Sequence, residues 1–472
     1  MHRKTFLRHS SLFAAAVAFR PGTVLASDPE FPVVRVPVEK RKFVSKAVDN
    51  AIAGFQQSTK NKELAWLFGN TFPNTLDTTV EFEMINGKPD TYVITGDIDA
   101  MWQRDSSAQV WPYLSLIKED PKLQQLIAGV INRQAANIIK DPYANAFYKD
   151  PGKVGEWKDD VTDMQPGIHE RKWEIDSLCY PIRLAYHYWK ISGDNSPFDD
   201  HWKQAAQLII KTFREQQRKN GQGPYKFERK TAWATDGVPL GGYGYPAKPV
   251  GLIHSMFRPS DDATIFPFLI PANLFAQTSL EQLAELVNAI YKDKAMVEDA
   301  RALATELKEA IYKYGIVSHP DFGKIYAYEV NGYGSYNIMD DANIPSLLGL
   351  PYLGAVSNKN PAYINTRRVL LSENNPFFFK GKAAEGIGGP HIGIDMIWPL
   401  SIIMRGLTSS DDGEIRNCIQ TLQHTHGDTG FMHESFHKDD PAKFTRKWFA
   451  WANTLFGEFI YTTWKKRPAL VV

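Results

Sequence analysis

The chain has 472 residues, 43% of them hydrophobic, which allows two or three domains or one large α-helical toroid. Its 54 Lys and Arg residues balance its 53 Asp and Glu residues, and a net charge of +1 excludes the strongly basic surface that attracts nucleic acids or anionic membranes. With 12 Trp, 20 Tyr and 27 Phe, the chain is 12% aromatic, and aromatic rings serve both in cores and as platforms for sugars, so we expect an uncharged partner.

Residues 2–26 have the pattern of a secretion signal. Basic residues at 2–4 precede a short apolar run at 12–19, and Ala26 ends a small-residue cleavage site. The run is too short to span a bilayer, so we expect no membrane insertion. Residues 3–8 also resemble a twin-arginine export sequence with Lys4 in the second place, which leaves the export route open. We therefore expect an exported protein, periplasmic or secreted.

After this signal, apolar residues recur at helical spacing in about a dozen segments. We expect helices over 42–57, 106–116, 123–139, 177–191, 202–216, 263–277, 279–291, 294–314, 344–350, 394–406, 414–424 and 445–464. Asn86-Gly87 between two alternating segments predicts a hairpin over 78–95, and a second hairpin is expected over 322–337. No linker and no βαβ alternation divides the set, so we predict one all-α domain over 27–472 with small decorating β-hairpins.

Charged residues cluster in the loops between these helices. Arg104 and Asp105 follow Asp97 and Trp102, and they offer a planar donor fork and an acceptor for sugar hydroxyls. The alternative is a local ion pair that caps the next helix. Asp176, at the start of another helix, has the same two interpretations.

Two further charged loops, at 256–263 and 340–346, precede predicted helices, and the Gly-rich segment 427–453 carries Glu434 between His433 and Ser435. Loops that gather at one rim of a helical toroid would bring these groups together. Cleavage of a glycosidic bond needs two carboxyl groups, one as acid and one as base or nucleophile, and Asp261 and Glu434 are our candidates.

The pair Asp261-Asp262 leaves one choice open. Neighbours on a helix point about 100° apart, so only one of the two would project into the site, and the negative neighbour would raise the pKa of the projecting acid. The alternative is that Ser260 and Asp262 form a helix cap and nothing more.

Metal and disulfide chemistry are not expected. Cys179 and Cys418 lie in apolar surroundings, which favours two buried thiols over a bridge. His433 and His437 have the i, i+4 spacing of a helical metal site, but Gly430 and the 438–441 turn argue against a helix there. We expect no metal and no cofactor.

Five segments of the chain resemble glycoside hydrolase family 125, the exo-α-1,6-mannosidases of a metal-independent α-mannosidase family. They are Asp97-Ile-Asp-Ala-Met-Trp-Gln-Arg-Asp-Ser106, Trp173-Glu-Ile-Asp-Ser-Leu-Cys-Tyr180, Phe257-Arg-Pro-Ser-Asp-Asp262, Met339-Asp-Asp-Ala-Asn-Ile-Pro-Ser-Leu-Leu348 and Gly430-Phe-Met-His-Glu-Ser-Phe436. They occur in the family's order over nearly all of the mature chain, and together they are highly specific.

The resemblance implies an (α/α)6 barrel and an inverting, exo-acting enzyme that releases mannose from non-reducing ends. It places the general acid at Asp261, with Asp262 as the alternative, and the general base at Glu434. Gln103 stands where the family usually has Leu, a polar change that we expect beside the rim and that affects only fine specificity.

The charged and aromatic residues of these segments, together with His391, are the candidate substrate-binding residues. They are Asp97, Trp102, Arg104, Asp105, Trp173, Asp176, Arg258, Asp341, His391 and His433. Two other functions remain open on the residues alone: a lyase or another glycosidase on the same toroid, and a non-catalytic periplasmic glycan-binding protein. The natural glycan and the oligomeric state are not determined by the sequence.

Overall fold

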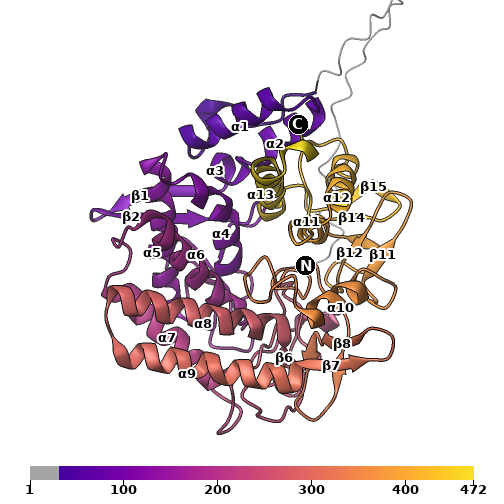
Figure 1. Ribbon diagram of the computed structural model, residues 1–472. Helices are drawn as coiled ribbons and strands as arrows, with labels where there is room; N and C mark the ends of the chain where they lie inside the picture. Colours follow the sequence, from indigo (N-terminus) through magenta and orange to yellow (C-terminus); the bar gives the residue numbers. More distant parts are fainter. Residues whose placement is uncertain (1–30) are drawn as a thin grey trace, which may run out of the picture. The chain divides into compact units, whose positions relative to one another are not determined.

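Helices form most of the regular secondary structure, and long loops separate them (Figure 1). The computed structural model describes residues 31–472, so the predicted signal over 1–26 lies outside the described residues. Residues 34–472 form one unit. None of the described helices is long and apolar enough to cross a membrane.

One set of helices is amphipathic, with one buried face and one exposed face. Its members are α1 (Lys46–Ser58), α2 (Lys62–Thr71), α5 (Pro121–Lys140), α7 (Asp200–Gln216), α9 (Lys294–Ala310), α10 (Pro361–Leu370) and α12 (Asp412–His424). Each begins after a Ser, Asn or Asp whose side chain accepts a hydrogen bond from a first-turn N–H group. These helices start where the sequence carries an N-cap signal.

A second set is buried on all sides over at least its first six residues. It consists of α4 (Gln103–Val110), α6 (Asp176–Ser192), α8 (Ile270–Ile290), α11 (Pro399–Leu407) and α13 (Ala450–Lys466). None of these five has a side-chain N-cap, and each follows an apolar residue. At three of these starts the first N–H group donates to a backbone carbonyl of another segment: Gln103 to Asn145, Ile270 to Tyr328 and Ala450 to Thr95.

The buried helices are neighbours of one another. Helix α4 packs against α6 and α13, α6 packs against α8, and α13 packs against α11. Amphipathic helices cover this set: α9 packs along α8, α12 along α11, and α5 packs on α6 and α7 (Figure 1). Short α3 (Asn74–Thr78) contacts α13.

Short strands form six small antiparallel sheets. The hairpin of β1 (Val80–Ile85) and β2 (Lys88–Val93) turns at Asn86-Gly87, whose φ angles of 50° and 78° suit an Asn-Gly turn. The other strands are β3 (Met101–Trp102), β4 (Ala146–Phe147), β5 (Ile168–Glu170), β6 (Phe268–Leu269), β7 (Ile316–His319), β8 (Gly323–Tyr326), β9 (Glu329–Val330), β10 (Tyr336–Asn337), β11 (Phe378–Lys380), β12 (Glu385–Ile387), β13 (Met396–Ile397), β14 (Ser435–His437) and β15 (Asp440–Thr445). Strands β3, β6 and β13 lead into α4, α8 and α11.

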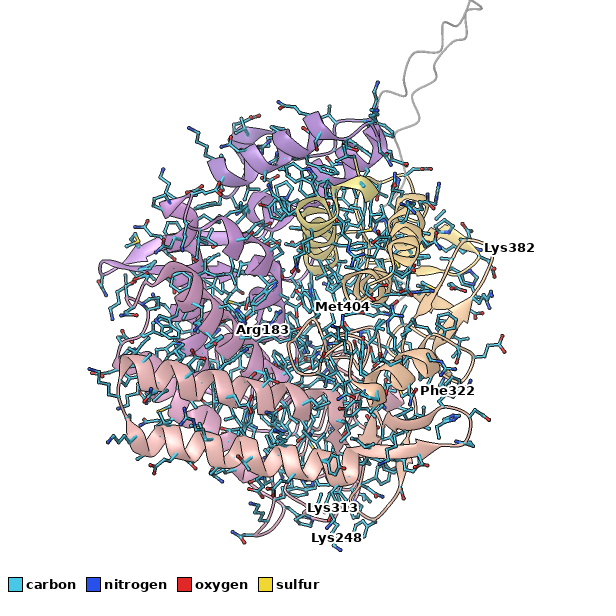
Figure 2. The ribbon with its side chains drawn as sticks, viewed as in Figure 1. Arg183, Lys248, Lys313, Phe322, Lys382 and Met404 are labelled. Atoms are coloured by element: carbon cyan, nitrogen blue, oxygen red, sulfur yellow. The ribbon has the colours of Figure 1, made fainter. Side chains whose placement is uncertain are left out.

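Single turns of other helix types complete the elements. They are η2 (Val38–Lys40), η3 (Trp111–Leu116), η4 (Ala234–Asp236), the π-helical η5 (Ile311–Gly315) and η6 (Pro468–Leu470). The side chains between the helices form one main hydrophobic core (Figure 2). Met404 lies inside it, whereas Lys313 and Lys382 project from the periphery. Cys179 and Cys418 are buried free thiols.

Several expected elements are corrected by the structure. The helix predicted over 263–277 begins at Ile270, because the residues before Pro271 form strand β6, and it continues without a break to Ile290. The helix predicted over 344–350 is a loop, in which the Asp340 carboxylate accepts the N–H groups of Leu347 and Leu348. Helices α2, α3 and α10 were not predicted. Within the 322–337 segment, β9 pairs with β10, whereas β8 pairs with β7, which lies before the segment.

Candidate active site

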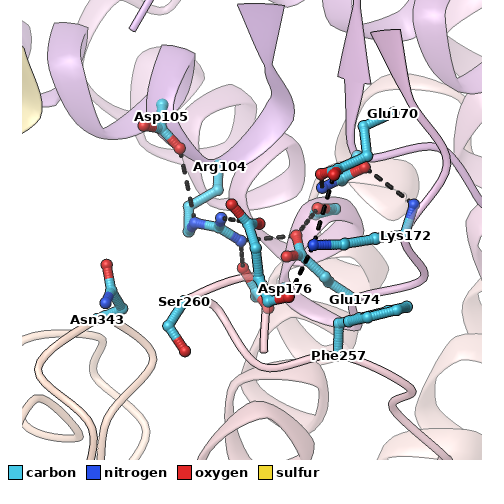
Figure 3. A network of polar contacts seen from close by, with 12 residues as sticks. Arg104, Asp105, Glu170, Lys172, Glu174, Asp176, Phe257, Ser260 and Asn343 are labelled. Carbon is cyan, nitrogen blue, oxygen red and sulfur yellow. Dashed lines mark hydrogen bonds and ion pairs between the residues drawn. The ribbon is translucent and has the colours of Figure 1, made fainter. Parts of the chain in front are cut away.

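The predicted carboxyl groups and Arg104 meet at the starts of the buried helices. Arg104 is the second residue of α4, and its Nη1 donates to Glu174 Oε2 at 2.6 Å and to Asp176 Oδ2 at 3.0 Å (Figure 3). Its Nη2 donates to Asp261 Oδ1 at 3.3 Å, and Asp105 Oδ2 lies 3.6 Å from its Nε. One guanidinium therefore serves four carboxyl groups.

This excess of carboxyl groups is buried. Glu174 and Asp176 are fully inaccessible to solvent, and Asp105 is 5% exposed. Burial raises the pKa of Glu174 well above its usual range and that of Asp105 to about 6, although Arg104 opposes both shifts, and the pKa of Asp176 is raised in the same way. Glu174 also shares a hydrogen bond with Asp261. Burial therefore shifts the carboxyl groups of Glu174, Asp105 and Asp176 toward their protonated forms.

A tight turn presents Asp261, not a helix as expected. Asp261 has φ of 66°, the Arg258 N–H donates to the Asp262 carbonyl at 2.7 Å, and the Asp261 N–H donates back to the Arg258 carbonyl at 2.9 Å. Lys172 Nζ donates to the Asp261 carbonyl at 2.9 Å. The Asp261 side chain remains 25% exposed, whereas that of Asp262 is 3% exposed. Of the two, Asp261 is the carboxyl group that a substrate can reach.

Asp262 instead faces His391. The His391 Nδ1 lies 3.3 Å from Asp262 Oδ1. Burial disfavours the imidazolium, but the hydrogen bond and charge of Asp262, with the fields of Glu434 and Asp261, raise the pKa of His391 to about 9. His391 is therefore a cation at neutral pH, and its side chain is 35% exposed.

Glu434 lies at the start of β14, beside the end of β15. Its Oε2 accepts from Thr445 Oγ1 at 2.9 Å, and its Oε1 lies 3.4 Å from Arg446 Nη1. The Thr445 hydroxyl is held in turn by Ser435 Oγ at 2.7 Å, across the β14–β15 pair. The Glu434 side chain is 5% exposed and receives a donor on each oxygen.

Electrostatic interactions join the carboxyl groups around Arg104 and the carboxylate of Glu434 into one site. His391 is within the fields of Asp261, Asp262 and Glu434. Asp105 is within the fields of both Arg104 and Arg446, which bind Asp261 and Glu434 respectively. The structure therefore brings together Arg104, Asp105, Asp176, Asp261, Asp262, His391 and Glu434.

Two candidate residues reach this site only through other side chains. Asp341 is fully buried and accepts from Ser260 Oγ at 2.7 Å, so it braces the turn before Asp261. Arg258 is also buried, and its Nε donates to Glu329 Oε1 at 2.7 Å behind the same turn. Because neither side chain is accessible, each positions the turn and does not contact sugar directly.

The aromatic candidates and His433 belong to the protein interior. Trp173 has no exposed surface, and its indole N–H donates to the His254 carbonyl, so neither ring face can stack on a sugar. Trp102 is 6% exposed and packs on His169. His433 stacks on Phe444 with ring centroids 3.7 Å apart, and it supports the strand next to Glu434.

Gln103 also lies away from the rim where we expected it. It is 1% exposed, and its side-chain amide donates to the Gln134 carbonyl at 3.2 Å, while the Gln134 amide donates to the Gln103 carbonyl at 3.2 Å. The presence of Gln103 where the family usually has Leu therefore affects how α4 packs on α5.

The sequence analysis missed Glu174, Lys172, Thr445 and Arg446. Glu174 and Lys172 flank the predicted Trp173, and alternation along this extended segment was the only signal that could have selected them. Arg446 was placed inside a helix that starts later, at Ala450. Its partner Asp97 is 349 positions away, a separation that no local pattern bridges.

No group of three or more His, Cys, Asp or Glu residues within 31–472 is arranged to hold a metal ion. His433 and His437 do not share a helix, because His437 lies in strand β14. The donors that face the carboxyl groups of the site are instead guanidinium, imidazole and hydroxyl groups.

Comparisons with known proteins identify the family of this chain. Residues 61–461 match the family profile described as metal-independent alpha-mannosidase (GH125). A fission yeast (Schizosaccharomyces pombe) relative, the meiotically up-regulated gene 157 protein, is 43% identical over 459 residues, which cover 93% of this chain and 90% of the relative.

Two solved structures give further likenesses. A Streptococcus pneumoniae metal-independent α-mannosidase, in a non-productive complex with α-1,6-mannobiose, is 40% identical, has a TM-score of 0.86, and aligns over 90% of this chain and 100% of its own. A bacterial glucoamylase complexed with acarbose is 12% identical, has a TM-score of 0.55, and aligns over 89% of this chain and 59% of its own, so it shows a likeness of fold alone. The family profile and the closely similar α-mannosidase together identify this chain as a glycoside hydrolase that belongs to the metal-independent α-mannosidase family, GH125.

Proposed function

We propose that this enzyme is an exo-acting, inverting mannosidase that removes terminal α-1,6-linked mannose from the non-reducing ends of glycans. Asp261 protonates the leaving oxygen, and Glu434 activates the water that attacks the sugar carbon. The observation that carries the proposal is the contrast between the two carboxyl environments: Asp261 lies beside buried carboxyl groups whose pKa is raised, whereas Glu434 accepts from two hydrogen-bond donors.

Arg104 and His391 complete the roles. Arg104 orients Asp261 and keeps Glu174 and Asp176 in place behind it. His391, the exposed cation between the two carboxyl groups, donates a hydrogen bond to a sugar hydroxyl. Asp97 is 40% exposed at the outer end of the base side and accepts from a second hydroxyl.

The proposal includes an (α/α)6 barrel. Buried helices that are neighbours of one another, covered by amphipathic helices, are the arrangement that such a barrel requires. The likeness of fold to the glucoamylase supports it. The site then lies at the end of the barrel from which the buried helices start. The basic and apolar pattern of residues 2–26 supports export as part of the same proposal.

Product analysis on linkage isomers tests the function. Protein lacking residues 1–26 is incubated with α-1,6-, α-1,2- and α-1,3-linked mannobiose, with and without a chelator, and released mannose is measured. We expect release from the α-1,6 isomer at the same rate in chelator. Equal release from all three isomers would contradict the linkage, and a reversible loss in chelator would contradict the metal-independent mechanism.

A further inference from the structure

Arg446 occupies the gap between the base and the loop that carries Asp97. We propose that Arg446 is a positioning residue for the base, which holds the Glu434 carboxylate oriented toward the attacking water. Asp97 holds Arg446 in this position. The inference rests on the proposed function, because it assigns Arg446 a task in water activation.

The guanidinium uses separate edges for the two carboxylates. Nε and Nη2 donate to Asp97 Oδ1 at 2.9 and 2.5 Å, and Nη1 points to Glu434 Oε1 at 3.4 Å. Nη2 also donates to Thr95 Oγ1 at 3.3 Å, and the cation lies over the Phe449 ring at 4.8 Å. A bidentate pair fixes the plane of an Arg side chain, so Asp97 determines where Nη1 points.

The backbone conformation at Arg446 and the backbone contacts beside Asp97 support the pairing of these two residues. Arg446 has φ of 39°, a left-handed conformation that costs a residue with a Cβ about 1–2 kcal/mol, and it follows the last residue of β15. The Asp97 N–H donates to the Trp448 carbonyl at 3.3 Å, and the Ala450 N–H donates to the Thr95 carbonyl at 3.0 Å. At Gly96, a Cβ would lie 2.3 Å from the Trp448 carbonyl oxygen. This close approach therefore requires glycine.

Both cations and carboxylates surround the contact between Glu434 and Arg446. Its cations are Arg446 and His391, and the carboxyl groups of Asp97 and Asp105 face Arg446 from the other side. Burial disfavours the charged guanidinium, but Glu434 and Asp97 raise the pKa of Arg446, so it stays positive. Thr445 Oγ1 and Arg446 occupy one lone pair on each Glu434 oxygen, and the remaining lone pairs are available to a water.

The test is the pH profile of kcat/KM on an aryl α-mannoside with a good leaving group, because such a substrate needs little help from the acid. We expect Arg446→Met to lower kcat/KM about 100-fold at pH 5 but less than 10-fold at pH 7.5. The acid limb of the profile should therefore move to higher pH, and KM should change less than twofold. Arg446→Lys keeps the positive charge but loses the bidentate guanidinium geometry. Its acid limb should therefore lie close to that of the wild type. Asp97→Asn should give a smaller shift than Arg446→Met.

Two controls separate this role from others. Thr445→Val removes a donor from Glu434 without touching Arg446 or Asp105, and it should move the acid limb in the same direction by a smaller amount. Arg214→Met breaks an exposed ion pair with Asp299 on the amphipathic helices and should leave the profile unchanged.

Thermal unfolding shows which variants are folded. If folded Arg446→Met loses activity equally at all pH values, or if its KM rises while kcat holds, the positioning role is overturned. Should Arg446→Met not fold, the same inference stands or falls on the pH profiles of Arg446→Lys, Asp97→Asn and Thr445→Val. Wild-type protein that does not cleave the aryl α-mannoside would overturn the proposed function, and this inference with it.

Discussion

The acid side and the base side of the site differ in their balance of charge. Around Asp261, the guanidinium of Arg104 serves four carboxyl groups, and burial raises the pKa of three of them. Around Glu434, Thr445 and Arg446 each donate to one carboxylate oxygen, and the field of His391, which is paired with Asp262, also reaches it. The carboxyl group proposed to donate a proton therefore lies among buried carboxyl groups with raised pKa, and the one proposed to accept a proton lies among hydrogen-bond donors. The same side chain chemistry serves two roles because the surroundings differ.

The base side should show the largest effect. Glu434→Gln removes the group that activates water, so we expect kcat to fall by about 10⁴-fold on natural and on activated substrates alike. The exposed Glu309→Gln on α9 is the matched control and should keep full activity. Steady-state kinetics on mannobiose and on an aryl α-mannoside measure both. A Glu434→Gln variant that loses activity on only one substrate would contradict the base role.

The acid side should depend on the leaving group. Asp261→Asn should lower kcat/KM on mannobiose by about 10³-fold but by far less on an aryl mannoside whose leaving group needs little protonation. Its neighbour provides the comparison, because Asp262 is buried against His391 and is not exposed to the leaving group. If Asp262→Asn shows the leaving-group dependence and Asp261→Asn stays active, the acid is Asp262.

How far the sequence predicts this site depends on the separation of the partners. The turn at Asn86-Gly87 and capped helices such as α7 were predicted because their signals are local, although the capped helices α2 and α10 were missed. The five motifs selected Asp261 and Glu434. They could not show that Asp262 pairs with His391, because that contact joins residues 129 positions apart.

The burial of individual side chains was the second feature that the sequence did not predict. Trp173 and Glu174 are neighbours, and the sequence favoured the Trp ring as a sugar platform. In the structure the ring is in the core, and Glu174 is the side chain that bonds to Arg104. The start of α8 was misplaced because the apolar residues of strand β6 extend the helical pattern toward residue 263. Only tertiary contacts separate these possibilities.

Loss of the shared cation should affect both folding and function. Arg104→Ala leaves four buried or half-buried carboxyl groups without their partner, so we expect the free energy of unfolding to fall by about 3–5 kcal/mol at neutral pH. Because the carboxyl groups can then take up protons, the loss should be smaller at pH 4. Urea unfolding at pH 4 and pH 7 measures this difference. Near-normal kcat/KM in a folded Arg104→Ala variant would return Arg104 to a capping role.

The smallest expected effect is a pH-dependent stability from Asp105. Its pKa is about 6 in the folded protein and about 3.9 when unfolded, so its contribution to stability is complete below pH 4 and is lost as the pH rises through 6. An asparagine side chain at this position does not titrate. Relative to wild type, Asp105→Asn should therefore gain about 2–3 kcal/mol of stability between pH 4 and pH 7, which urea unfolding at the two pH values measures. A difference that does not change with pH would mean that Asp105 is ionised throughout.

The stereochemistry of the product tests the division of roles most directly. If Glu434 activates water, the two catalytic carboxyl groups stand about 6.5–9.5 Å apart, and attack occurs on the face opposite the leaving group. Proton NMR of wild-type enzyme with α-1,6-mannobiose, recorded before mutarotation, should then show β-mannose as the first product. An initial α-mannose signal would mean that Glu434 attacks the sugar as a nucleophile, and it would contradict the assignment of Glu434 as the base.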